Sequence, residues 1–359
     1  MSIYLDYNAT APLRPEVSVR VSELLEAPAN PSSSHRFGRD AKKHLEDARK
    51  TIAENISAFP NEIIFMSCGS EANTTALRGF PDRRVLVSVI EHSSVLNNGE
   101  ALIAVDANGI IELTALDTLL AQTPNALVSI MLANNETGVI QPIREAAEIC
   151  KKHGALLHTD AVQALGKIPV DFTALGVDMM TMAAHKMGGP IGAAALVVRQ
   201  DLLLAPLLVG GGQELRRRAG TENIAAIGGF ARAVELIDFA QMQRLRGWLD
   251  AMEQTLIQKG ATIFPITEYR VPNTRLPNTS CLAIGNLSQE VMLMKLDLAG
   301  FAVGAGSACS SGRIEPSHVL SAMDVEKDLA SRAIRISGGW ATTEDEIKEI
   351  TVSLLAAAS

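Results

Sequence analysis

The chain has 359 residues, of which 47% are hydrophobic and 20% charged, and its formal net charge is −8. This length and composition are those of a globular protein with room for one large domain and a smaller one. The excess of acidic residues argues against a nucleic-acid-binding surface, because such a surface needs a basic footprint.

The cysteines Cys68, Cys150, Cys281 and Cys309 lie far apart and form no CxxC pair. This spacing argues against an intrinsic metal site and against a disulfide framework, and it fits a reducing compartment. No apolar run is long enough to cross a bilayer, and the first residues lack the pattern of a signal peptide. We therefore expect a soluble, cytoplasmic protein that binds neither nucleic acid nor membrane.

The first two thirds of the chain alternate between helical and strand-like patterns. Pro12 and Pro15 end a short extended segment at the N-terminus. Apolar periodicity predicts helices at 16–26, 41–58 and 143–153, and β-branched or apolar runs predict strands at 63–67, 85–89, 127–132, 155–160 and 178–183. Short apolar strands that alternate with helices indicate a parallel sheet with helices on both faces. Ligands of such folds bind at the carboxyl ends of the strands.

The pattern changes after residues 210–223, GGGQELRRRAGTEN. A long helical region at 224–259 leads to sparser strands, such as 280–285, and to a final helix from Thr343. This change predicts a second, α+β domain of about a hundred residues.

Polar residues follow the predicted strands at their carboxyl ends. Gly69 and Ser70 precede a helix, whose free N–H groups and positive end are suited to a phosphate. The alternative is an ordinary helix start with Ser70 as its cap. His92 follows the next strand, and Asn134, Asn135 and Glu136 the one after. Each of these has an alternative interpretation, as a structural histidine and as a turn rich in turn-forming residues.

The strongest physical signal is the pair Asp160 and Lys186, which lie at consecutive strand ends. An aspartate at the end of a hydrophobic strand is costly without a cationic partner. A protonated pyridine nitrogen is such a partner, and it keeps a pyridoxal ring an electron sink. Lys186, at the centre of TMAAHKMGGP, is placed to form a Schiff base. The alternative is a solvated lysine beside a Gly–Pro turn.

The chain resembles the cysteine desulfurases of the class V aminotransferase group, which are fold-type I pyridoxal-phosphate enzymes. The resemblance rests on nine motifs in order: YLDYNATAP, NPSSSHRFGRDA, EHSSVL, NNETGVIQPI, HTDAVQALGKIPVD, AHKMGGP, GGGQELRRRAGTEN, GSACSSG and IRISGGWATTEDEI. It implies an α/β fold with a mainly parallel seven-stranded sheet in a large domain, residues 14–245. A smaller α+β domain, residues 1–13 and 246–359, would carry the loop with Cys309.

The resemblance also implies the catalytic roles. Lys186 would form the internal aldimine with pyridoxal 5'-phosphate, and His92 would stack on the ring and assist proton transfer. Cys309 would be the thiolate that takes sulfur from L-cysteine as a persulfide and releases alanine. Its neighbours in 304–312 are small residues, from which we expect a mobile segment.

Further residues would hold the cofactor and the substrate. Asp160 would pair with the pyridine nitrogen, and Gln163 and Asn135 would lie near the phenolic oxygen. The phosphate would be held by Gly69, Ser70 and His185, and by Thr221 from the second subunit of a homodimer. Arg335, with Asn135, would bind the substrate. Other expected partners are a sulfur acceptor or an iron–sulfur scaffold protein, on which Cys309 would act as a transient cluster ligand.

Three departures from the family pattern stand out. Ala183 occupies a position where a serine often donates to the phosphate, a loss of about 0.5–1.5 kcal/mol of cofactor binding. Ile191 and Trp340 replace residues that are often basic. The chain stops at Ser359, where housekeeping members continue into an extension that docks the scaffold protein.

Alternatives remain open at this point. Another class V enzyme, an aminotransferase or a selenocysteine lyase, would use the same cofactor. The substitution at Ala183 also fits a partner protein of reduced activity on the same fold. A nucleotide-binding protein is disfavoured, because the chain has neither G-x-G-x-x-G nor Walker spacing.

Overall fold

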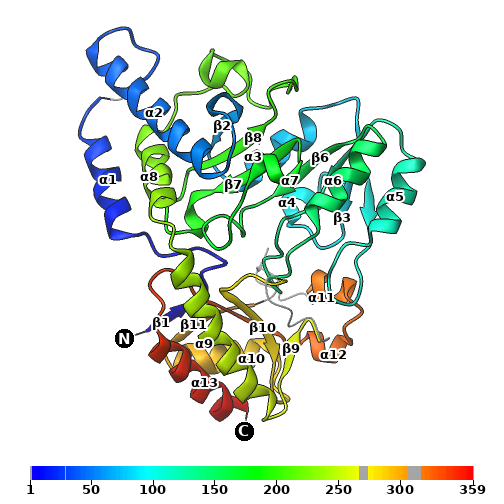
Figure 1. Ribbon diagram of the computed structural model, residues 1–359. Helices are drawn as coiled ribbons and strands as arrows, with labels where there is room; N and C mark the ends of the chain where they lie inside the picture. The colour runs from blue at the N-terminus through cyan, green and yellow to red at the C-terminus, as the bar shows by residue number, and fades with distance from the viewer. Residues whose placement is uncertain (1, 29, 267–273, 306–316, 359) are drawn as a thin grey trace.

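The computed structural model describes residues 2–28, 30–266, 274–305 and 317–358. The chain forms two sheets, each covered by helices; in Figure 1 the larger sheet lies in the upper part of the view and the smaller sheet in the lower part. The larger sheet has seven strands in the order β2-β8-β7-β6-β5-β3-β4. Its strands are β2 Ile63–Met66, β3 Arg84–Ser88, β4 Ala101–Ile103, β5 Ala126–Ser129, β6 Leu156–Asp160, β7 Met179–Ala183 and β8 Ala194–Val198.

The pairing of these strands confirms the mainly parallel sheet. Strands β4, β3, β5, β6 and β7 pair in parallel, whereas β8 runs antiparallel to both β7 and β2. The carboxyl ends of β6 and β7 are therefore neighbours, since Asp160 pairs with Thr181. This places the predicted polar residues on one edge of the sheet.

Helices cover both faces of the larger sheet, as the near-continuous apolar strands predict. Ile63 and Phe65 pack in one core cluster with α1, α2 and α8, whereas Ile64 and Met66 pack in another with α3. The helices of this part are α1 Pro15–Leu25, α2 Arg36–Asn55, α3 Gly69–Arg78, α4 Ser93–Leu96, α5 Leu113–Ala121, α6 Ile143–Lys152, α7 Phe172–Leu175 and α8 Ile224–Glu235.

The smaller sheet contains both the first strand and the last strands of the chain. Its order is β1-β11-β12-β10-β9, with β1 parallel to β11 and the other pairs antiparallel. Its strands are β1 Ile3–Leu5, β9 Thr262–Phe264, β10 Thr279–Ala283, β11 Phe301–Ala305 and β12 Ile334–Ser337, and its helices are α9 Phe239–Ile257, α10 Gln289–Leu298, α11 His318–Ala322, α12 Lys327–Ala330 and α13 Glu344–Ala358. Because β1 pairs here, residues 6–9 pass between the two sheets. The domain boundaries proposed above stay a prediction.

Side-chain caps explain where three helices depart from expectation. α2 begins at Arg36 rather than residue 41, because His35 Nδ1 accepts a hydrogen bond from Gly38 N. The helical region at 224–259 is two helices, and Asp238 between them caps α9 by accepting from Gln241 N. α3 begins at Gly69 with Cys68 as its cap, so the capping role considered for Ser70 is wrong.

Within the described residues, no helix is both long enough and apolar enough to cross a membrane. The same part of the chain holds no group of three or more histidine, cysteine, aspartate or glutamate side chains arranged around a common metal position.

Candidate active site

A cavity of about 320 Å³ lies at the carboxyl ends of β6 and β7. It brings together most of the residues predicted from the sequence: Gly69, Ser70, His92, Asn135, Asp160, Gln163, His185, Lys186 and Arg335. Ala183 also lines it, with eight residues that were not predicted: Asn8, Ala9, Cys68, Asn73, Ser94, Met131, Ala133 and Val162. A larger hollow of about 650 Å³ lies at the opposite end of β6, away from every predicted site residue.

Two further predicted residues are Thr221 and Cys309. Thr221 is exposed and lies outside its wall in this chain. Cys309 lies outside the described residues, as does most of the 304–312 segment; Gly304 and Ala305 form the end of β11.

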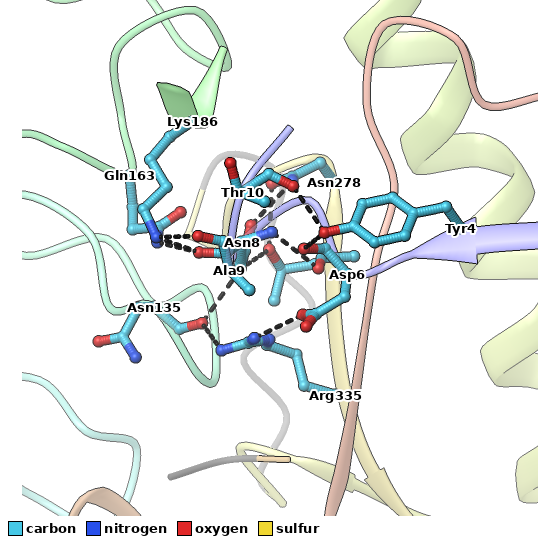
Figure 2. Close-up of polar contacts among 12 residues, drawn as sticks. Tyr4, Asp6, Asn8, Ala9, Thr10, Asn135, Gln163, Lys186, Asn278 and Arg335 are labelled. Atoms are coloured by element: carbon cyan, nitrogen blue, oxygen red, sulfur yellow. Dashed lines mark hydrogen bonds and ion pairs between the residues drawn. The ribbon is translucent and has the colours of Figure 1, made fainter. Parts of the chain in front are cut away.

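Lys186 enters the cavity from a single 3₁₀ turn, Ala184–Lys186, directly after β7. Its Nζ donates to the carbonyl oxygens of Asn8 at 2.7 Å and Ala9 at 2.6 Å (Figure 2). Burial lowers the pKa of this amine to about 8, with the charge of Arg335 acting in the same direction. At neutral pH the fraction of Lys186 that is the neutral, nucleophilic amine is therefore minor, but far larger than for an ordinary lysine.

The turn that follows Lys186 depends on glycine. Gly188 has a φ of +87°, and a Cβ there would lie 2.7 Å from the Arg14 side chain. A Cβ on Gly189 would lie 2.7 Å from that of Ala184. These close approaches fix the path of the chain that holds Lys186 in place.

Asp160 ends β6 and is 7% exposed. Its Oδ2 accepts from Asn73 Nδ2 at 2.7 Å, and its Oδ1 accepts from Val162 N at 2.9 Å. No ion pair is formed by this carboxylate with any lysine, arginine or histidine of the described chain. A buried carboxylate that faces a cavity without a cation is suited to a cationic ligand group.

His92 precedes the short helix α4 and contacts Ser94. Its Nδ1 accepts from Ser94 N at 3.1 Å and lies 2.8 Å from Ser94 Oγ. Because Nδ1 accepts, the neutral ring carries its proton on Nε2. Desolvation by the surrounding protein lowers the pKa of His92, while Asp160 opposes this shift. The ring is exposed on its cavity side and neutral near pH 7, as a proton acceptor must be.

The N-terminus of α3 lines one end of the cavity, and this end, which we call the phosphate end, is suited to a phosphate. Cys68 Sγ accepts from Glu71 N at 3.5 Å, and Arg218 Nε lies 2.9 Å from Glu71 Oε1. A Cβ on Gly69 would lie 4.0 Å from that of Ala183, so the Ala183 methyl group occupies the wall opposite this helix start. The phosphate end therefore has no hydroxyl at position 183.

His185 also lines this end of the cavity, where its Nδ1 lies 3.2 Å from Thr10 Oγ1. Burial lowers the pKa of His185 to about 4, and the charges of Lys186 and Lys167 add to this effect. The ring is therefore neutral and offers an N–H donor rather than a positive charge.

Arg335 comes from β12 of the smaller sheet. Its Nη2 lies 2.6 Å from Asp6 Oδ1, and its Nη1 donates to the carbonyl oxygen of Asn135 at 3.0 Å (Figure 2). Its Nε is buried and has no hydrogen-bond partner in the described part of the chain. The guanidinium is thus held at the cavity by one contact from each sheet, and its positive charge is suited to an anion.

Asn8 and Asn73 are the main site residues that sequence reasoning missed. Asn73 lies on α3 within one turn of Ser70, so helical spacing from the predicted phosphate seat could have found it. Asn8 follows β1, far from any strand of the larger sheet, and no local pattern marks it. Its carbonyl oxygen accepts from both Lys186 and Gln163.

Comparisons with known proteins agree with this geometry. Residues 3–350 match the family described as Aminotransferase class-V. The chain is 41% identical to a cysteine desulfurase of Cereibacter sphaeroides, over 97% of this chain and 93% of that protein. It is 38% identical to the cysteine desulfurase IscS of Dictyoglomus turgidum, over 96% and 91% of the two chains. The crystal structure of a NifS-like protein from Rickettsia africae superposes with a TM-score of 0.92 at 34% identity, covering 99% of each chain.

Proposed function

The chain belongs to the class-V aminotransferase family and, within it, to the pyridoxal-phosphate-dependent cysteine desulfurases, and from this premise we propose how its own residues carry out the reaction. The enzyme removes sulfur from L-cysteine. The observation that carries the assignment of the site is that one cavity is lined both by an amine of lowered pKa and by a buried carboxylate that forms no ion pair with the described residues. These are Lys186 and Asp160.

The residues of the cavity fit pyridoxal phosphate. Asp160 would pair with the pyridine nitrogen, and Asn73 Nδ2 holds the carboxylate in place for this contact. The start of α3, with Gly69 and Ser70, would bind the phosphate together with the neutral His185. When bound, the cofactor supplies an electron sink that activates the carbon and sulfur atoms of the substrate.

Three side chains act on the substrate in this proposal. Lys186 uses its neutral amine to bind the cofactor and to move a proton at the substrate α-carbon. His92 assists proton transfer at the substrate, and the Ser94 N–H that donates to its Nδ1 fixes the orientation of the ring. Arg335, which lines the cavity, binds the substrate carboxylate beside Asn135.

Cys309 receives the sulfur. Its thiolate attacks the sulfur atom of the substrate, the substrate C–S bond breaks, and a persulfide forms on Cys309. The carbon that carried the sulfur takes up a proton, and the product leaves as alanine. This role rests on the GSACSSG motif.

We propose a homodimer that completes the site. Several large apolar side chains are exposed near Thr221 in the sequence: Ile191 at 79%, Leu203 at 92%, Val209 at 86% and Leu215 at 70%. Exposed apolar side chains in such number favour a protein interface. A second copy that covers them would bring its own Thr221 to the phosphate end of this cavity.

The persulfide is then passed on in the cytoplasm. An acceptor thiol, either on an iron–sulfur scaffold protein or on an enzyme of tRNA thiolation, would attack the outer sulfur. On a scaffold protein, Cys309 would also serve as a transient cluster ligand.

Alanine release from L-cysteine, by the intact enzyme and by Cys309→Ala, tests this function. We expect the intact enzyme to form alanine, and the variant to lose turnover while it retains the cofactor. Full alanine release by the variant would show that Cys309 does not take the sulfur. Absence of turnover in both, with the cofactor bound, would favour a partner protein of reduced activity.

A further inference from the structure

A buried lysine, Lys167, lies directly behind the cavity wall. It is 5% exposed, and it forms no ion pair with a carboxylate of the described residues. Its Nζ donates to Gln163 Oε1 at 2.5 Å and to Asn8 Oδ1 at 2.8 Å. Lysine is almost never buried without a charged partner, so this placement needs a physical reason.

The orientation of the Asn8 amide is fixed independently of Lys167. Asn8 Nδ2 donates to the carbonyl oxygen of Asn135 at 3.1 Å, and a carbonyl can only accept. Asn8 Oδ1 therefore faces the other way, where it accepts from Lys167 Nζ and from Asn278 Nδ2 at 3.0 Å.

The Gln163 amide is oriented by the same logic. Its Nε2 donates to the carbonyl oxygen of Asn8 at 3.0 Å, and its Oε1 accepts from Lys167. If this amide were turned over, its oxygen would face the Asn8 carbonyl and its NH₂ group would face the lysine amine. The contact with the Asn8 carbonyl would then lose its hydrogen bond, and the lysine amine could no longer act as the donor to Gln163.

Burial lowers the pKa of Lys167 well below its usual range, and the charges of Lys186 and Arg335 add to the shift. A neutral amine has two N–H groups, and Lys167 has two acceptors. The uncharged form, which burial favours, therefore has one N–H for each acceptor.

We propose that Lys167 is a positioning residue, which holds the Gln163 amide so that its NH₂ group faces the cavity and the Asn8 carbonyl that binds Lys186. The inference rests on the proposed function, in which Gln163 lies near the phenolic oxygen of the cofactor. An N–H donor there withdraws charge from that oxygen. It thereby lowers the pH at which the nitrogen of Lys186, once bonded to the cofactor, loses its proton.

The test is a pH titration of the visible absorbance of the bound cofactor. Lys167→Met keeps the length of the side chain and removes its N–H donors. We expect the absorbance midpoint to rise by about half a pH unit or more, the effect of losing roughly one hydrogen bond. Lys259→Met, at an exposed lysine, is the matched control and should leave the midpoint unchanged. An unchanged midpoint in Lys167→Met would overturn the proposal.

A double-mutant cycle separates positioning from a direct effect of charge. In a Gln163→Leu background, Lys167→Met should give no further shift, because the amide on which it acts is gone. The same shift in both backgrounds would contradict the proposal. Lys167→Gln is a milder second variant, since its nitrogen ends one bond short of both acceptors, and it should move the midpoint in the same direction. Failure of the proposed function gives a different result, because the unsubstituted protein itself would then show no cofactor absorbance.

Discussion

Asp6 and Arg335 form an ion pair, with 2.6 Å between Oδ1 and Nη2, that joins the end of β1 to β12 at the edge of the cavity. Both residues belong to the smaller-sheet part of the chain. The pair therefore fixes the guanidinium from one side, while the carbonyl oxygen of Asn135 holds it from the larger-sheet side.

Asp6→Asn should weaken substrate capture. The amide keeps the shape of the carboxylate but loses the charge-assisted hydrogen bond that orients Arg335, so we expect KM for L-cysteine to rise about tenfold with little change in kcat. Steady-state alanine release measures both constants. Asp201→Asn, which removes a surface ion pair with Arg199, is the control. A fall in KM would show instead that Asp6 competes with the substrate carboxylate.

The pKa of Lys186 predicts the pH dependence of cofactor capture. Only the neutral amine reacts, so the rate at which the cofactor-free protein takes up pyridoxal phosphate should rise with pH through about 8 and then level off. Arg335→Met removes a positive charge that lowers this pKa, and the curve should move to higher pH. The rise in visible absorbance after mixing gives the rate, and a curve that does not move would contradict this electrostatic coupling.

A substitution at the end of β7, Ala183→Ser, should raise the affinity for the cofactor. Ala183→Ser restores a hydroxyl opposite the start of α3, and one added hydrogen bond should lower the dissociation constant of the cofactor about two- to tenfold. Ala184→Ser is the matched control, because the neighbouring Ala184 packs in the other core cluster. Equilibrium dialysis compares the three proteins. An unchanged constant in Ala183→Ser would show that no phosphate oxygen lies within reach of position 183.

A buried ion pair outside the cavity predicts a large effect on stability. Arg49 forms two hydrogen bonds with the Glu214 carboxylate, at 2.9 and 2.8 Å, and the Glu214 side chain is 1% exposed. Glu214→Gln leaves the buried guanidinium with only the exposed Glu46 as a counter-charge and should lower the free energy of unfolding by about 3–5 kcal/mol. Glu46→Gln removes an exposed partner of the same arginine and should cost about 0–1 kcal/mol. Chemical denaturation distinguishes them, and equal effects would contradict this prediction.

Much of the site could be predicted from the sequence, because its residues follow strands that form one parallel sheet. Asp160 and Lys186 each end a predicted strand or follow one, and neighbouring parallel strands bring such ends together. The rest depends on contacts between distant segments. Asn8 reaches the cavity only because β1 pairs with β11, some three hundred residues away in sequence. Lysine is a residue type usually found at the surface, so the sequence gives no sign that Lys167 is buried. Its burial follows from the packing of the loop after β6 against Asn8.

The central claim is that the cavity around Lys186 holds pyridoxal phosphate through a covalent bond to that lysine. Borohydride reduction of the cofactor-loaded protein makes this bond permanent, and mass spectrometry of the digested protein then identifies the modified residue. We expect the added mass on the peptide that contains Lys186, and its absence from Lys186→Ala. Added mass on Lys167, or on no lysine in a protein that still releases alanine from L-cysteine, would contradict the account.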